Sequence, residues 1–183
     1  MAQLVTFSTN GEKRPGALKN DRILDLRAAG LPSGEIGDLL EIARGGDAIL
    51  ARVRSAIADW SGPDFAMDEV KLEAPIQNPP KVIGIGLNYL DHCREANMEV
   101  PKEPVIFSKY ATSVTGPYDN INFYRDVTQN VDYEVELGVI IGKSTFRVSE
   151  KEAMDKVLGF TVVNDISARD LQLSGAGQWD YGK

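Results

Sequence analysis

The chain has 183 residues, of which 20 are basic and 27 acidic, and this net charge of −7 argues against binding to a nucleic acid backbone. Hydrophobic residues make up 43% of the chain and charged residues 26%, as in a folded globular protein rather than a disordered one. Apolar runs such as residues 139–141 are too short to span a bilayer. We therefore expect neither nucleic acid nor membrane as a partner.

Cys93 is the single cysteine of the chain, and His92 is the single histidine. One cysteine cannot form an intrachain disulfide, which fits a reducing compartment. One histidine excludes a zinc site made of several imidazole or thiolate ligands, so any metal would be held mainly by oxygen. Residues 1–16 resemble neither a signal peptide nor an Arg- and Ser-rich transit peptide, and the expected location is cytoplasmic.

Residues 1–74 are predicted to form a small α+β unit that begins with strands. Apolar residues at 4–7 and 22–26 are typical of short strands, and Asn10-Gly11 between them is typical of a tight turn. The sequence therefore predicts strands that pair through turns in the first part of the chain.

Two helices are predicted after these strands. Apolar residues over 36–43 indicate a short helix that ends at Gly45-Gly46. From Ile49 to Trp60, apolar residues recur three and four positions apart, which predicts a longer helix with one buried face. Asp47 is expected to cap its N-terminus.

The proline-rich segment 75–80 is predicted to be a linker, because residues before proline adopt extended conformations. The second domain, 81–183, is dominated by strand-like sequence, which favours a mixed sheet or roll over a repeated βαβ array. The capping-box spacing from Ser149 to Glu152 predicts the start of a helix. The expected strands lie at 82–86, 105–107, 133–141 and 160–163, and the expected helices at 89–96 and 149–158.

Two phosphate-binding motifs are nearly matched and are rejected. Gly84-Ile85-Gly86 follows a strand, but Tyr89 stands where a dinucleotide fingerprint has its third glycine. Gly142-Lys143-Ser144 resembles the end of a P-loop, but the residues before it are strand-like and the first glycine, Gly138, is one position too close. Neither motif therefore predicts a nucleotide-binding protein.

Glu134 and Glu136 are the first candidate site residues. Because alternate side chains of a strand share a face, both carboxylates project from the same side of the predicted strand, roughly 7 Å apart. Two like charges this close raise one pKa unless a cation lies between them. The opposite face of the same strand is apolar and consists of Val135, Leu137, Val139 and Ile141.

Asp165 offers a third carboxylate just after the predicted strand at 160–163. Three carboxylates without an imidazole match Mg²⁺, Mn²⁺ or Ca²⁺, which prefer oxygen ligands. The alternative is that Glu134 and Glu136 lie on the solvated side of an edge strand, which for such a pair considered alone is the commoner arrangement.

His92 and Glu95 lie three positions apart on the predicted helix 89–96 and are therefore neighbours on one face. A carboxylate that is hydrogen-bonded to an imidazole holds its tautomer and raises its basicity, as a general base requires. The alternative is a surface histidine in an ordinary helical ion pair. A nucleophilic pair of His92 and Cys93 is rejected, because adjacent helical residues point about 100° apart.

Ordered motifs along the second domain resemble the fumarylacetoacetate hydrolase family. The motifs at 101–104 and 178–183 look most like the subgroup of fumarylacetoacetate hydrolase domain-containing protein 2. The motifs are 86–89 with His92 and Glu95, 104–107 with Lys109, Gly116-Pro117, 132–137, 139–143 and 159–170. The resemblance implies an α+β, mostly β fold: a small N-terminal α+β unit followed by an incomplete, fumarylacetoacetate-hydrolase-like mixed β-roll. It is strong over 81–183 and loose before that.

The resemblance also implies roles for individual residues. Glu134, Glu136 and Asp165 would bind Mg²⁺ (or Mn²⁺ or Ca²⁺), and His92 with Glu95 would form the base dyad, on a helix that acts as a lid in relatives. Arg169 and Gln172 would bind substrate, and Lys183 would be catalytic near the substrate carboxylate and the developing oxyanion. Family members are usually homodimers, and a mitochondrial location is compatible with the resemblance although no transit peptide is visible.

The activity implied by the resemblance is metal-dependent chemistry on small 2-oxo or 1,3-dioxo acids. Stabilisation of an enolate by the metal would serve C–C bond hydrolysis of acylpyruvates and also keto–enol tautomerisation or decarboxylation of oxaloacetate. Relatives continue well beyond Lys183, so about half of the usual catalytic domain is expected to be absent. The alternative is therefore a non-catalytic truncated fragment or an oligomerisation piece of such an enzyme.

Overall fold

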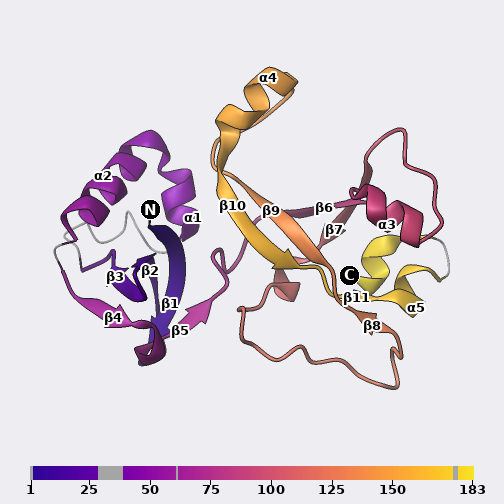
Figure 1. Ribbon diagram of the computed structural model, residues 1–183, viewed down its shortest axis with the longest axis horizontal. Helices are drawn as coiled ribbons and strands as arrows, with labels where there is room; N and C mark the ends of the chain where they lie inside the picture. The colour runs from indigo at the N-terminus through magenta and orange to yellow at the C-terminus, as the bar shows by residue number, and fades with distance from the viewer. Residues whose placement is uncertain (1, 29–38, 61, 175–176) are drawn as a thin grey trace. The chain divides into compact units, whose positions relative to one another are not determined.

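The computed structural model of the chain describes residues 2–28, 39–60, 62–174 and 177–183 (Figure 1). Its contacts divide the chain into two compact units. The first consists of Met1–Asn78, Val114–Asn120 and Leu137–Thr161, and the second of Pro79–Ser113, Ile121–Glu136 and Val162–Lys183. The break after Asn78 lies inside the predicted linker 75–80. The units are discontinuous in sequence, however, whereas the predicted boundary separates two continuous segments.

The first unit is organised around a five-stranded antiparallel sheet with the order β4-β3-β2-β1-β5. Asn10 and Gly11 join β1 to β2 with φ angles of 50° and 79°, and this pair of left-handed residues matches the right-handed twist of a hairpin. The predicted strands and turn are therefore present. The strands are β1 (Gln3–Thr9), β2 (Glu12–Lys19), β3 (Arg22–Asp25), β4 (Asp64–Ala66) and β5 (Lys71–Glu73).

Two helices, α1 (Leu39–Arg44) and α2 (Gly46–Asp59), pack against this sheet. The predicted apolar stripe of the second helix is confirmed: Val53 is buried, and the other members are partly buried against the core. Asp47 as N-cap is wrong. The cap residue is Gly45, and Asp47 lies inside the first turn, where its charge still favours the helix dipole. Residue Ile36, which the first helical pattern includes, is outside the described residues.

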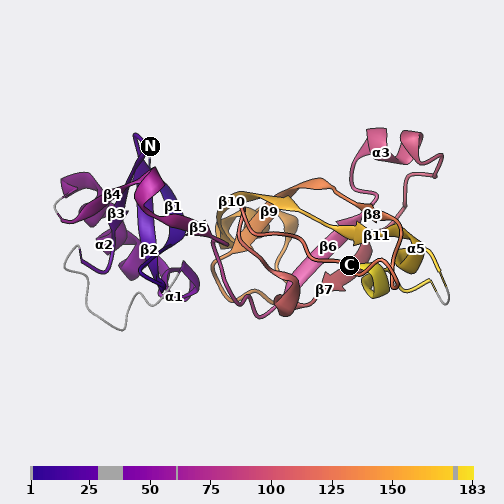
Figure 2. The same cartoon turned by 90° about the horizontal axis from the view of Figure 1, so that it is seen from below.

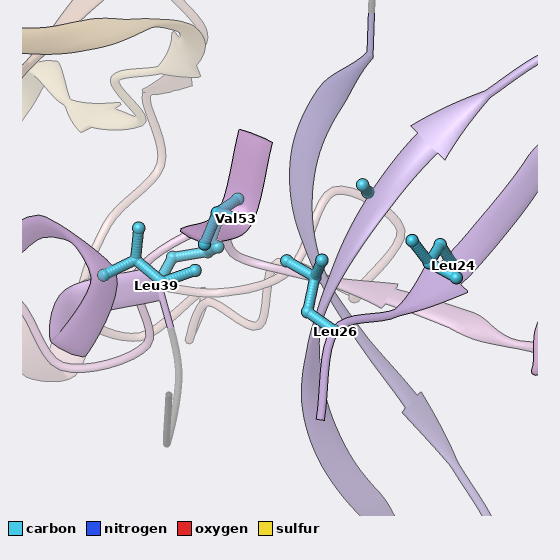
Figure 3. Close-up of a cluster of buried hydrophobic side chains, with 6 residues drawn as sticks. Leu24, Leu26, Leu39 and Val53 are labelled. Atoms are coloured by element: carbon cyan, nitrogen blue, oxygen red, sulfur yellow. The ribbon is translucent and has the colours of Figure 1, made fainter. Parts of the chain in front are cut away.

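The core of the first unit joins side chains of the sheet and the two helices (Figure 3). It consists of Ala17, Leu24, Leu26, Leu39, Ile42 and Val53. Leu24 is completely buried, so replacing it with alanine removes its contacts and leaves a cavity. We expect Leu24→Ala to lower the free energy of unfolding by about 2–5 kcal/mol, measured by urea denaturation. Leu173→Ala, at an exposed leucine, is the matched control, and equal losses in the two variants would contradict the assigned core.

We expect the ion pair of Asp64 to make the first unit sensitive to acid. Its carboxylate accepts hydrogen bonds from Arg22 Nε (2.9 Å) and Nη2 (2.6 Å) and from Trp60 Nε1 (3.1 Å). The Arg22 guanidinium, followed by the Trp60 indole, lowers the pKa of Asp64 to about 2. A carboxylate with a lowered folded-state pKa stabilises the fold above its unfolded pKa of about 3.9 and loses this contribution as pH falls toward about 2.

We therefore expect the urea midpoint of the protein to fall between about pH 4 and pH 2. Asp64→Asn should reduce this fall, because the variant no longer has a carboxylate to protonate. Asp59→Asn, at an exposed position of the same unit, should leave the fall unchanged. An identical pH dependence in wild type and Asp64→Asn would show that this ion pair contributes nothing to acid stability.

Over the described ranges, the second unit contains two short antiparallel strand pairs and four short helical segments. Strands β6 (Val82–Gly86) and β7 (Val105–Lys109) lie side by side, with helix α3 (Leu90–Glu95) in the segment that connects them (Figures 1 and 2). Strand β8 (Val131–Asp132) pairs with β11 (Ser167–Ala168), which leads directly into α5 (Arg169–Gln172) and, further on, the 3₁₀ helix η4 (Trp179–Gly182). The predicted strands 82–86 and 105–107 and the helix at 89–96 are present.

Strands β9 (Val135–Ile141) and β10 (Val157–Asn164) form a separate pair. The prediction of a single strand over 133–141 is wrong at its start, because the observed strand begins at Val135. The chain changes its pairing partner just before that residue: β8 pairs with β11, and β9 pairs with β10. Helix α4 (Glu150–Ala153) begins with the predicted capping box, in which Glu152 accepts from the Ser149 hydroxyl at 2.6 Å. It is shorter than predicted. The remaining 3₁₀ helices are η1 (Met67–Glu69), η2 (Ala111–Ser113) and η3 (Met154–Lys156).

Large apolar side chains on these strands are exposed. Val135 has 77% of its surface exposed and Leu137 has 61%, so the face of β9 predicted to be apolar faces outward. The others are Ile83, Ile106, Val139, Ile141, Phe160 and Val162. Exposed apolar strands are surfaces at which proteins associate or aggregate. None of the helices in the described ranges combines the length and hydrophobicity that crossing a membrane requires.

Candidate active site

The three predicted metal ligands lie together in the second unit. The backbone N–H of Asp165 donates to the carbonyl of Glu134 at 2.8 Å, and the Glu134 N–H donates to the Asn164 side chain at 3.2 Å. Glu136 lies close enough to Glu134 and Asp165 for their charges to raise its pKa. The structure therefore brings together carboxylates that the sequence places on two separate strands.

Lys183 occupies the position between two of these carboxylates. Its Nζ lies 2.7 Å from Glu134 Oε2 and 2.9 Å from Asp165 Oδ2. The side chain is only 2% exposed, and the ammonium also lies 4.8 Å from the centre of the Phe107 ring. A buried ammonium requires such partners, because removing a charge from water is costly. The predicted catalytic lysine therefore lies among the predicted metal ligands.

Lys109 is a member of the site to which the sequence assigns no role. Its Nζ donates to Asp165 Oδ1 at 2.5 Å and to the Ile166 carbonyl at 2.9 Å, and its side chain is 13% exposed. The alternating exposure along β7 could have indicated this role, because Lys109 lies on the less exposed face of the strand together with Val105 and Phe107. A lysine at an inward position of a strand requires a carboxylate partner.

Both lysines lower the pKa of Asp165. Burial raises the pKa of the Asp165 carboxyl, but hydrogen bonds and attraction from Lys109 and Lys183 outweigh it, so the pKa lies below its ordinary value. Asp165 is therefore ionised at neutral pH, as a ligand for a hard cation must be.

Arg169 is held by carboxylates on both sides. Its Nε and Nη2 donate to Asp132 Oδ2 at 3.0 and 2.9 Å, and Nη2 also pairs with Glu134 Oε1. Its Nη1 donates to Gln172 Oε1 at 2.9 Å, and Gln172 is almost completely buried. Arg169 lowers the pKa of Asp132. The two predicted substrate-binding residues are thus in contact with each other, and Arg169 also contacts the predicted metal ligand Glu134.

Glu136 differs from its neighbours. Burial, followed by the negative charges of Glu134 and Asp165, raises its pKa, and in the described part of the chain it has no ion-pair partner. The cluster as a whole contains four carboxylates against the three cations Lys109, Arg169 and Lys183. The donor type and the excess negative charge therefore fit a divalent cation.

The charge of the cluster suits a metal ion better than the arrangement of its carboxylates does. Among the described residues, no group of three histidine, cysteine, aspartate or glutamate side chains is arranged as a metal site. Glu134 instead forms ion pairs with Arg169 and Lys183. The predicted ligands thus fit a metal by their chemistry, and their role stays a prediction.

Helix α3 carries His92 and Glu95, and both side chains are exposed. The structure, over the ranges it describes, shows no hydrogen bond between them. The helix is anchored on its other face, where Cys93 is buried and its Sγ donates to the Leu87 carbonyl at 3.4 Å. Leu87 has a φ of 54°, a left-handed conformation that turns the chain sharply from β6 into the helix.

Residues 81–183 match the family model described as the C-terminal part of fumarylacetoacetate (FAA) hydrolase. The chain belongs to the fumarylacetoacetate hydrolase family. This confirms the resemblance and its subgroup: over 146 residues the chain is 48% identical to "Oxaloacetate tautomerase FAHD2A, mitochondrial" of Bos taurus, an alignment that covers 79% of this chain and 46% of that protein. It is 43% identical over 182 residues to a putative hydrolase of Burkholderia ambifaria, covering 99% of this chain and 61% of the relative.

The fold is confirmed by a solved structure of the same family. A fumarylacetoacetate hydrolase from Exiguobacterium antarcticum superposes with a TM-score of 0.74 and 31% identity, over 94% of this chain and 58% of the other. The fumarylacetoacetate hydrolase fold is thus present in part, since the chain spans 46–61% of the length of these relatives.

Proposed function

We propose that the chain carries the metal-binding and proton-transfer residues of an enzyme that acts on small 2-oxo or 1,3-dioxo acids. The single observation that carries this proposal is the clustering of Glu134, Glu136 and Asp165. Together with the neighbouring Asp132 they make four carboxylates, which exceed the three paired cations Lys109, Arg169 and Lys183. A bound Mg²⁺, Mn²⁺ or Ca²⁺, held by these three residues, would supply Lewis-acid stabilisation of an enolate. Membership of the fumarylacetoacetate hydrolase family supports this chemistry.

The protein's own residues would bind and orient the substrate. Arg169 places a permanent positive charge beside the carboxylate cluster, where it would attract the carboxylate of a substrate, and Asp132 and Gln172 fix its orientation. Lys183 holds a positive charge in a water-poor position, where it stabilises negative charge that develops on a substrate oxygen. Both groups select small anionic substrates, although the chain as a whole is acidic.

His92 would move the proton. It is the single imidazole of the chain, and Glu95 lies three residues along the same exposed helix. Transfer of a proton from C3 of a 2-oxo acid to its C2 oxygen gives the enol tautomer. Removal of a proton from water instead directs hydroxide at a ketone carbon, and the C–C bond breaks with its electron pair leaving as an enolate, which regains the proton. We favour keto–enol tautomerisation of oxaloacetate, because a relative 48% identical is named an oxaloacetate tautomerase.

The test is turnover of oxaloacetate and of an acylpyruvate by the purified chain, with Mg²⁺ and with EDTA. The expected result is metal-dependent loss of the enol absorbance of oxaloacetate, with slower turnover of the acylpyruvate. Thermal unfolding with Mg²⁺ and oxalate, a stable 2-oxo acid mimic, is measured in parallel. No turnover together with no thermal shift would overturn the proposal.

The second candidate is a non-catalytic fragment or an oligomerisation piece, which the exposed apolar side chains of β6, β7, β9 and β10 favour. Light scattering during size-exclusion chromatography distinguishes the two. A homodimer that turns over substrate supports the enzyme, whereas inactive aggregates of undefined size support the fragment.

The expected compartment is cytoplasmic, although some relatives are named mitochondrial.

A further inference from the structure

The position of the Lys183 ammonium depends on close backbone packing around the 3₁₀ helix that precedes it. We propose that Gly182, Gly86 and Trp179 are positioning residues, which place Lys183 Nζ between Glu134 and Asp165. The inference goes beyond the proposed function, because it concerns where one ammonium is held and stands whether or not a metal binds.

Gly182 allows η4 to lie directly on α5. A Cβ atom at position 182 would lie 2.5 Å from the Ala168 carbonyl oxygen and 2.5 Å from the Gln172 nitrogen. These are backbone atoms at the two ends of a helix, and they cannot move aside as the end of a flexible side chain can. Figures 1 and 2 both show the yellow C-terminal turn beside α5. Any larger residue would therefore push the turn, and Lys183 with it, away from α5.

Gly86 has the same function on the other side of η4. A Cβ atom at position 86 would overlap the indole of Trp179, so the bare backbone at the end of β6 is where this ring packs. Trp179 lies against Phe107, with ring centres 6.0 Å apart and planes at 50°. Phe107 in turn packs over Gly84, where a Cβ would also overlap its ring. The two aromatic rings therefore brace η4 against the strand pair.

This packing ends at the ammonium. The Phe107 ring centre lies 4.8 Å from Lys183 Nζ, a cation–π distance that favours the charged amine beside the ring. Contacts with α5 on one side and with the aromatic rings on the other leave η4 little freedom. The Gly84-Ile85-Gly86 motif, which fails as a dinucleotide fingerprint, thus has a different physical explanation: it makes room for two aromatic rings.

The test is acylation of lysines by a water-soluble N-hydroxysuccinimide ester, followed by mass spectrometry of each lysine. In the wild type, Lys183 and Lys109 should react slowly because both are nearly buried, whereas the half-exposed Lys13 and Lys71 should react fast. Gly182→Ala and Gly86→Ala should raise the rate at Lys183 by about tenfold or more, because an added methyl group cannot be accommodated.

Three comparisons make the result specific. Gly159→Ala is the control glycine, because a Cβ there meets nothing within 4 Å, and it should leave Lys183 protected. Lys109 is the internal reference, since its partners Asp165 and Ile166 lie outside η4, and it should stay protected in every variant. Trp179→Ala removes the packing of the indole without adding a clash, so it should expose Lys183. It therefore tests the proposal even if Gly182→Ala or Gly86→Ala fails to fold.

Two outcomes would overturn the proposal. Continued protection of Lys183 in Gly182→Ala, Gly86→Ala and Trp179→Ala would show that these residues do not position it. Equal rises at Lys183 and Lys109 in all three variants, Trp179→Ala included, would show that these residues hold the whole cluster rather than place Lys183. Neither reading depends on turnover or on Mg²⁺, so failure here and failure of the proposed function are distinguishable.

Discussion

Replacing Glu136 with alanine is expected to abolish the response of the protein to Mg²⁺. Glu136 is the one carboxylate of the described cluster without a cation partner, and its pKa is raised by burial and by Glu134 and Asp165. Without it, three carboxylates would face the three cations Lys109, Arg169 and Lys183. No excess negative charge would then remain to offset the dehydration of a divalent ion.

We expect the Mg²⁺ dissociation constant of Glu136→Ala to rise at least about 100-fold, because removing even a supporting group of a metal site costs 10- to 100-fold. Isothermal titration calorimetry measures this directly. Glu136→Gln keeps the size of the side chain and loses its charge, so it should behave like the alanine variant. Glu103→Ala, at an exposed glutamate of the same unit, should bind Mg²⁺ as the wild type does. Unchanged affinity in both Glu136 variants would remove this residue from the metal site.

Replacing His92 with alanine is expected to remove most of the turnover while leaving Mg²⁺ binding intact. The chain offers no other imidazole, and a positioned general base contributes about 10²- to 10⁴-fold to a rate. His92 lies on an exposed helix that is anchored through Cys93, so its removal leaves no cavity in a core. The loss should therefore appear in kcat rather than in the free energy of unfolding.

The measurement compares oxaloacetate turnover by His92→Ala and by Arg94→Ala, with Mg²⁺ titrations of both. Arg94 lies on the same helix and pairs with Asp91 at the surface, so its removal tests the helix without the base. Diethylpyrocarbonate provides a second test, because it would modify the single imidazole of the chain and should inactivate only the wild type and Arg94→Ala. Undiminished turnover by His92→Ala would contradict the assignment.

Features that depend on near neighbours could be predicted from the sequence alone. The Asn10-Gly11 turn, the apolar face around Val53 and the capping box from Ser149 to Glu152 each involve residues a few positions apart, whose backbone preferences and side-chain spacing are local. The fold class and the family were also predicted correctly, since several motifs occur in one order along the chain. The predicted cap at Asp47 was wrong by two residues, because a glycine can start a helix without a side-chain acceptor.

The tertiary structure decided which of these residues meet. Glu134 and Lys183 are 49 positions apart, and nothing in the sequence near either residue specifies that one neutralises the other. The break between β8 and β9 arises because the chain exchanges one pairing partner for another, which is a property of two distant strands. Likewise, alternation predicts two faces of β9, but only packing determines that the carboxylate face turns inward and the apolar face outward. Local patterns therefore specify the helices and strands, whereas contacts between distant residues specify the site. Bringing distant residues together costs chain entropy, and no short segment of sequence shows whether the folded chain offsets that cost.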